Sequence, residues 1–130
     1  MDALPSLQEA SAGLLFPSES EYPFEGFRFK GRPAEMSIEL LLNELRLPVD
    51  SPSEEVDLEH LFRRVTTDQD WHEEDEKLQV SRFRILLKVI KNNLSYIKVF
   101  RIGTVAIDVY ILGQAPCGEW VGLNTKVIET

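Results

Sequence analysis

Residues 105–112 read Val-Ala-Ile-Asp-Val-Tyr-Ile-Leu, and this stretch decides the fold class. Branched apolar side chains recur at every second position of it, at Val105, Ile107, Val109 and Ile111. A period of two puts these side chains on one face of a β-strand, and we expect that face to be buried. Tyr110 and Ala106 lie on the other face, which indicates that this face is partly covered as well.

Two segments of similar composition flank this strand, residues 99–102 and residues 119–128. Both are rich in Val, Ile, Phe or Trp, which favour strands. Gly103 and the segment QAPCG (114–118) stand between them as turns, so the last third of the chain is predicted to be an antiparallel meander. Residues 24–30, where Phe alternates with basic residues, add a further strand.

Helical spacing of apolar residues is typical of the first two thirds of the chain. It predicts short helices over 4–15, 37–46 and 58–65, with Ser37 and Asp57 as N-caps, and a long helix from about 73 to 94. Proline-containing segments between them, 16–24 and 51–55, are predicted to be an ordered loop and a surface turn. Helices followed by strands predict one α+β domain over residues 1–130, with a mainly antiparallel sheet of about four strands.

Composition excludes several classes of protein. The chain has 130 residues, of which 43% are hydrophobic and 28% charged, as in ordinary globular domains. Cys117 is the single cysteine, so a disulfide scaffold is excluded. No apolar run approaches the roughly 20 residues of a membrane span, and the first residues do not resemble a signal peptide. We therefore expect a cytoplasmic protein.

Negative charge is concentrated in the first part of the chain. The sequence has 22 acidic and 14 basic residues, for a net charge of −8. Residues 1–80 carry a net charge of −12, from 19 acidic and 7 basic residues, and residues 81–130 carry +4, from 3 and 7. Such a surface repels nucleic acid and anionic membranes, so neither is an expected partner. It favours a positively charged protein, unless the charge serves only solubility.

No motif of an enzyme is present in the sequence. Nucleophile-elbow, Walker and dinucleotide-binding patterns are absent, and His60 and His72 lack evident catalytic partners. The acidic run 68–76 fails as an EF-hand, because the loop positions that require Gly and Glu hold Glu73 and Gln79. We expect a protein that is not an enzyme and that has no metal site or cofactor of its own.

Two features of the sequence leave alternatives open. Trp71 lies between a polar loop and an acidic helix start, and is either an exposed interface anchor or a residue buried against the core. Glu19 and Glu21 alternate between Pro17 and Pro23, and such a stiff loop either binds a cationic group or is simply solvated.

The chain resembles the bacterial nuclease A inhibitor family in several blocks of sequence that occur in one order. They are SAGLLFPSESEYPFE (11–25), TTDQDW (66–71), LLKVIKNNL (86–94), DVYILG (108–113) and GLNTKVIET (122–130). We identify no shared motif between about residues 32 and 56, so the role of that segment stays open.

This resemblance implies an α-β-α sandwich that inhibits a sugar-nonspecific DNA/RNA endonuclease of the ββα-metal type. The inhibitor, a monomer when free, would bind one nuclease and block its Mg²⁺-bearing active site. The family's contact residues correspond here to Glu19, Asp70, Trp71 and Thr130. Glu19 and Thr130 would approach the metal of the partner, and Asp70 and Trp71 would bind beside it.

Two other functions remain compatible with the sequence. One is an acidic interaction module that imitates DNA and masks a different basic protein. The other is a divalent-cation hydrolase that uses the acidic residues of segment 68–76, which would require the isolated protein to bind metal.

Overall fold

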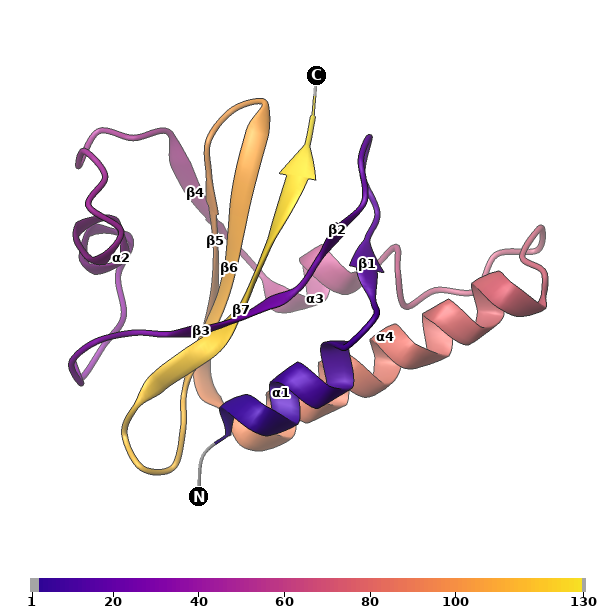
Figure 1. The fold of residues 1–130 in the computed structure, drawn as a ribbon, viewed down its shortest axis with the longest axis horizontal. Coiled ribbons are helices and arrows are strands. Elements are labelled where there is room, and N and C mark those ends of the chain that lie inside the picture. The colour runs from indigo at the N-terminus through magenta and orange to yellow at the C-terminus, as the bar shows by residue number, and fades with distance from the viewer. Residues whose placement is uncertain (1–2, 130) are drawn as a thin grey trace.

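A computed structural model of the chain describes residues 3–129, and Figure 1 shows their arrangement. In this part of the chain the main sheet has five strands, in the order β3-β7-β6-β5-β4, and all neighbours are antiparallel. The strands are β3 (Glu25–Arg28), β4 (Ser53–Val56), β5 (Ser95–Ile102), β6 (Ala106–Gln114) and β7 (Trp120–Ile128). The helices are α1 (Leu4–Ser11), α2 (Ile38–Glu44), α3 (Leu58–Phe62) and α4 (Glu74–Asn93). The α+β class is confirmed.

The predicted meander forms the centre of the sheet, as β5, β6 and β7. Ile107 pairs with Val127 and Ile111 with Leu123, so apolar side chains of neighbouring strands meet on one face. The expectation for Val105 was wrong, because this residue precedes β6 in the turn and is 53% exposed. Ile107, Val109 and Ile111 are buried as predicted.

The main sheet has one strand more than the sequence predicted. Residues 51–55 were expected to form a surface turn, and instead residues 53–56 form β4, which pairs with β5 at the edge of the sheet. Three of the four residues of β4 are exposed, and only Val56 is half-buried. The strand has no apolar alternation because an edge strand lies largely in solvent, so its hydrogen bonds to β5 alone define it.

The proline-bounded segment is also more regular than expected. β1 (Leu15–Phe16) and β2 (Tyr22–Pro23) form a small antiparallel hairpin, and only residues 17–21 between them are a loop. Phe16 is buried in an aromatic cluster with Phe24, Phe62 and Phe83, with ring centres 6.0 to 6.4 Å from its own. Burial of this ring anchors the hairpin to the core.

Helices pack against both faces of the main sheet (Figure 1). On one face, side chains of α1, α3 and α4 surround the inward residues of the central strands, among them Val99, Val109 and Leu123. On the other face, α2 covers Phe100, Leu112 and Trp120. Both faces of the sheet are therefore apolar. This explains why the residues between the inward-facing positions of the central strands are often apolar as well.

Local capping determines where the helices begin. Ser37 caps α2, and its Oγ accepts a hydrogen bond from the Leu40 amide at 3.3 Å. Asp57 occupies the N-cap position of α3, but the predicted side-chain cap is not formed. Glu73 and Glu76 form a reciprocal capping box that begins α4.

Among residues 3–129, none of these helices has the length and apolarity that crossing a membrane requires.

Candidate functional site

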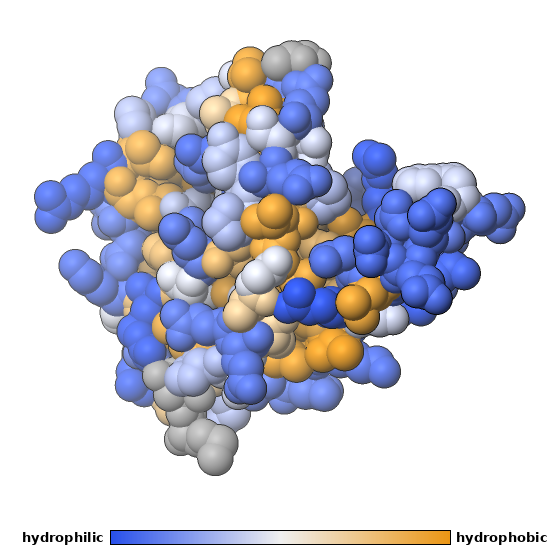
Figure 2. All heavy atoms as spheres, turned by 45° about the vertical axis from the view of Figure 1, so that its right-hand side comes forward, coloured by the Kyte–Doolittle hydropathy of each residue, from blue (hydrophilic) through white to orange (hydrophobic). Residues whose placement is uncertain are grey.

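A groove of about 1230 Å³ opens between the hairpin, the end of β7 and the loop that leads into α4. Its lining includes Pro17 and Glu19 of the hairpin loop, Gln69 and Trp71 before α4, and Ile128 and Glu129 at the end of β7. Figure 2 shows this face hollowed between the hairpin side at the top and the start of α4 at the right, with apolar side chains in the hollow. Three segments that are far apart in the sequence therefore meet around one depression.

The hairpin loop is attached to the end of β7. The Glu19 amide donates a hydrogen bond to the carbonyl of Ile128 at 3.4 Å, and the Ile128 amide donates to Ser18 Oγ at 3.1 Å. Lower in the hairpin, Thr125 Oγ1 donates to the carbonyl of Pro23 at 3.0 Å. The exposed Glu19 side chain is thus carried on backbone whose position the sheet determines.

Asp70 and Trp71 occupy the two central positions of a tight turn. The His72 amide donates to the carbonyl of Gln69 at 3.0 Å, and the Gln69 amide donates to His72 Nδ1 at 3.1 Å. Trp71 is 72% exposed, and its ring contacts the His72 imidazole edge to face with centres 4.3 Å apart. Burial of Trp71 against the core, one of the two alternatives, is therefore wrong for this chain.

Side-chain bonds hold the loop that carries this turn. Thr66 Oγ1 donates to the carbonyl of Phe62 at 2.7 Å, which ties the loop to α3. Arg84 of α4 donates from Nε to the Thr66 carbonyl at 2.8 Å, and its Nη2 lies 3.4 Å from Asp68 Oδ2. Because both neighbouring helices bind the loop, Trp71 is presented from a restrained backbone.

The four predicted contact residues differ in how the structure places them. Glu19 and Trp71 line the groove from different walls, and Asp70 is exposed beside Trp71 but does not line it. Thr130 lies outside the described residues. Glu129, which precedes it, lines the groove, and its amide donates to the carbonyl of Val105 at 2.9 Å.

Sequence reasoning missed the cationic side chains of the groove. Arg64 follows α3 and Arg101 belongs to β5, and both line the same space as Glu19. No local pattern marks either residue, because each enters the groove only through the packing of its element. Among residues 3–129, the acidic run 68–76 included, no three His, Cys, Asp or Glu side chains are grouped closely enough to hold a metal ion.

One titratable side chain with a shifted pKa lies away from the groove. Burial raises the pKa of the Tyr110 phenol, and the nearby carboxylates of Asp108 and Glu25 raise it further. Tyr110 packs against Phe27 on the α2 side of the sheet, with ring centres 5.1 Å apart. The phenol therefore stays neutral at physiological pH and serves packing.

Comparison with known families decides the relationship of this chain. The model of the nuclease A inhibitor-like protein family matches residues 1–130, the whole chain. The chain belongs to this family. The resemblance seen in separate blocks of the sequence is thereby confirmed, and the match includes the segment between residues 32 and 56 where no motif was evident. No curated protein matches the sequence of this nuclease A inhibitor-like chain.

In this member of the nuclease A inhibitor-like family, Ser18 is predicted to order the hairpin loop. Its Oγ accepts hydrogen bonds from the amides of Ile128 and Ser20 and donates to the Ser20 carbonyl. Replacing Ser18 by Ala should lower the free energy of unfolding by about 1 kcal/mol, the usual contribution of such bonds. Urea denaturation measures this loss, with Ser6→Ala on the exposed face of α1 as the control. Equal free energies of unfolding of the two variants would contradict the proposed role of Ser18 in holding the hairpin loop against β7.

Proposed function

We propose that this protein is a stoichiometric inhibitor of a Mg²⁺-dependent, sugar-nonspecific endonuclease of the ββα-metal type. The proposal comprises a monomeric inhibitor that binds one nuclease molecule in the cytoplasm and occludes its active site. Family membership supports an inhibitor of a nuclease. The observation that carries the occlusion is the convergence of Glu19, Trp71 and the end of β7 around a single groove.

Glu19 would act as a substitute for a substrate phosphate. An endonuclease site holds phosphate with cationic side chains and a divalent metal ion, and a carboxylate suits both. The loop that carries Glu19 is tied to β7 by the backbone bond to Ile128, so the carboxylate arrives with its backbone already positioned. Because a glutamate side chain contains no phosphodiester, the nuclease would have no bond to cleave at this position.

Thr130 would act beside Glu19 as the second group at the metal. A chain end offers a carboxylate, and threonine adds a hydroxyl, so both groups present oxygen to a hard cation or its water ligands. The contact between Glu19 and Ile128 supports this pairing, because residue 128 is two positions before the end. The charge surplus of residues 1–80 would accelerate encounter with a cationic site.

Asp70 and Trp71 would bind the nuclease outside its metal centre. An exposed tryptophan on a restrained turn loses little conformational freedom when a partner buries it, which makes it a strong anchor. Asp70, at the neighbouring position of the turn, would pair with a cationic side chain. Because screening weakens exposed charges over about 8 Å at physiological salt, tight binding would depend on the desolvated contact of Trp71.

The decisive measurement is a plasmid-digestion titration with a purified ββα-metal nuclease at fixed Mg²⁺. We expect activity to fall to zero near one equivalent of the protein.

A pull-down from a panel of basic proteins tests the alternative function, an acidic module that imitates DNA. An inhibitor should retain the nuclease selectively, whereas an imitation of DNA should retain many of the basic proteins.

The Glu19→Gln variant tests the substitute for phosphate. We expect the inhibition constant to rise about tenfold to a hundredfold, because a carboxylate is replaced by an isosteric amide at a site that requires negative charge. Glu21→Gln is the matched control, since Glu21 belongs to the same loop, lines the same groove and undergoes the same change of charge. Equal effects of the two substitutions would show that only the net charge of the loop matters.

A further inference from the structure

Arg101 joins the end of the chain to the far edge of the sheet. Its Nη2 lies 2.5 Å from Glu129 Oε1, and its Nε lies 3.6 Å from Glu54 Oε1. The Arg101 side chain is 20% exposed, whereas its two partners are 52% and 62% exposed. A half-buried guanidinium is therefore held between a carboxylate of β4 and the last described residue of the chain.

Strand register explains how one side chain reaches both partners. Glu54 of β4 is directly opposite Arg101 of β5, so the two side chains lie on the same face. Ile107 and Val127 belong to that face as well, and Glu129 follows Val127 by two positions. Arg101, Ile107 and Glu129 line the same small cavity of about 270 Å³.

Glu129, the last residue that the structure describes, is held at two points. Its amide donates to the carbonyl of Val105, and its carboxylate accepts from Arg101. Chain ends are normally poorly ordered unless something ties them down. Two independent bonds therefore fix the position of Glu129 against the sheet.

We propose that Arg101 is a positioning residue that orients the C-terminus for inhibition by holding Glu129, with Glu54 fixing its guanidinium. This inference rests on the proposed function, in which Thr130 enters the active site of the nuclease. Glu54 lies between residues 32 and 56, so the segment without an evident family motif gains a role. Arg101 would raise affinity because the terminus is ordered before binding instead of during it.

The first test needs no nuclease. Heteronuclear ¹H–¹⁵N relaxation of the free protein reports the order of the Glu129 amide on the nanosecond scale. We expect Arg101→Met to lower the order of this amide, because the variant removes the ion pair that holds the Glu129 side chain. Unchanged relaxation at the Glu129 amide would overturn the proposal, whatever the variant does to inhibition.

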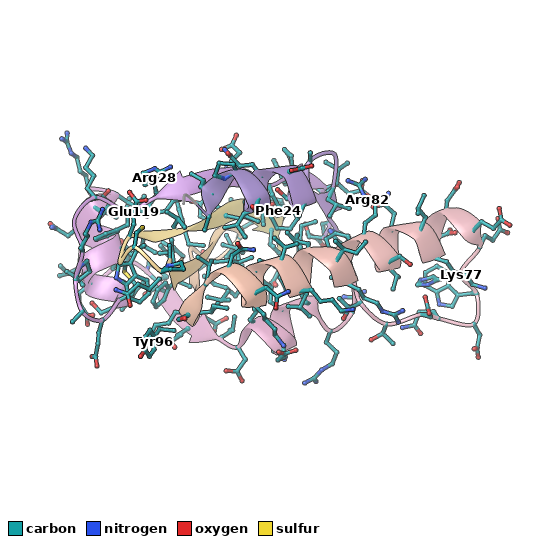
Figure 3. All side chains as sticks on the ribbon, turned by 90° about the horizontal axis from the view of Figure 1, so that it is seen from below. Phe24, Arg28, Lys77, Arg82, Tyr96 and Glu119 are labelled. Carbon is teal, nitrogen blue, oxygen red and sulfur yellow. The ribbon has the colours of Figure 1, made fainter. Side chains whose placement is uncertain are left out.

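A matched control lies at the opposite end of β7, the strand that Glu129 follows. Arg28 pairs with Glu119, just before β7, and Figure 3 shows these two side chains pointing toward one another. Arg28→Met removes a second Arg–Glu pair of the sheet but should leave the relaxation of the Glu129 amide unchanged. If the Arg101 variant folds poorly, Glu129→Gln removes the same pair without a change in β5, and it should likewise lower the order of the backbone amide at position 129.

The second test is the inhibition constant in a double-variant cycle. Arg101→Met alone should weaken inhibition about tenfold, as expected when a terminus must be ordered on binding. In a protein that lacks Thr130, the same substitution should cause no further loss, because nothing remains to be positioned. An undiminished loss in that background would mean that Arg101 contacts the nuclease directly, and would overturn the positioning role. If the wild-type protein inhibits no nuclease, the proposed function fails, and relaxation still decides whether Arg101 orders the terminus.

Discussion

Replacing Trp71 by Ala is expected to weaken the nuclease complex by about 2–4 kcal/mol, which corresponds to roughly a 30- to 700-fold loss of affinity. The side chain is 72% exposed in the free chain, so its removal should hardly change the free energy of unfolding. On binding, the indole would be desolvated, and its truncation would leave a gap in the contact. Calorimetric titration with the nuclease measures the loss, and thermal denaturation measures the stability.

Leu78→Ala provides the control for this prediction. Leu78 is a large apolar side chain of α4 that is 60% exposed, and it does not line the groove. We expect its removal to leave the affinity within about twofold of the wild type, since surface changes outside a contact are nearly neutral. If Trp71→Ala and Leu78→Ala bind the nuclease equally well, Trp71 is not an anchor.

Removing Thr130, or extending the chain beyond it, is expected to weaken inhibition by about a hundredfold or more. Both changes displace the terminal carboxylate, and the loss of one partner of a desolvated charge contact costs about 2–5 kcal/mol. An extension would add a second penalty, because it places further residues where the proposal puts the chain end against the nuclease. Plasmid digestion at increasing inhibitor concentration, with the truncated and the extended protein, measures the effect.

The same extension placed at the other end of the chain is the control. α1 begins at the opposite end of the molecule from the end of β7 (Figure 1). An N-terminal extension should therefore leave the inhibition constant unchanged. Full inhibition by a protein with a C-terminal extension would exclude entry of the terminus into the active site, and would leave Glu19 and Trp71 as a separate contact.

Elements with a strong local pattern were predicted correctly. The long helix α4 has an apolar stripe and an acidic first turn, and the meander β5–β7 alternates with a period of two, so neighbours in the sequence already specify both. Ser37 caps α2 as expected because a cap is made within one turn of backbone. The sequence also identified the family, since its motifs are read directly from residue order.

Elements that depend on a distant partner were missed. The exposed strand β4 exists only through its hydrogen bonds with β5, more than 40 residues later in the sequence. The hairpin β1–β2 is likewise held by β7, through Thr125 and Ile128. The side chains of a short polar segment do not indicate which strand it pairs with. Such a segment is stabilised as a strand by backbone hydrogen bonds to a partner strand that lies elsewhere in the sequence.

The features of the candidate site also fall into two groups, those that the sequence indicates and those that depend on distant contacts. Residue order alone was sufficient to single out Glu19, Asp70, Trp71 and Thr130 through the family resemblance, and to indicate an acidic protein without enzyme motifs. Only the tertiary structure decided that Trp71 is exposed, that Glu19 lies against the end of β7, and that Arg101 binds Glu129. The physical reason is that exposure and long-range contacts depend on how whole elements pack, whereas capping, periodicity and motifs are properties of a few adjacent residues.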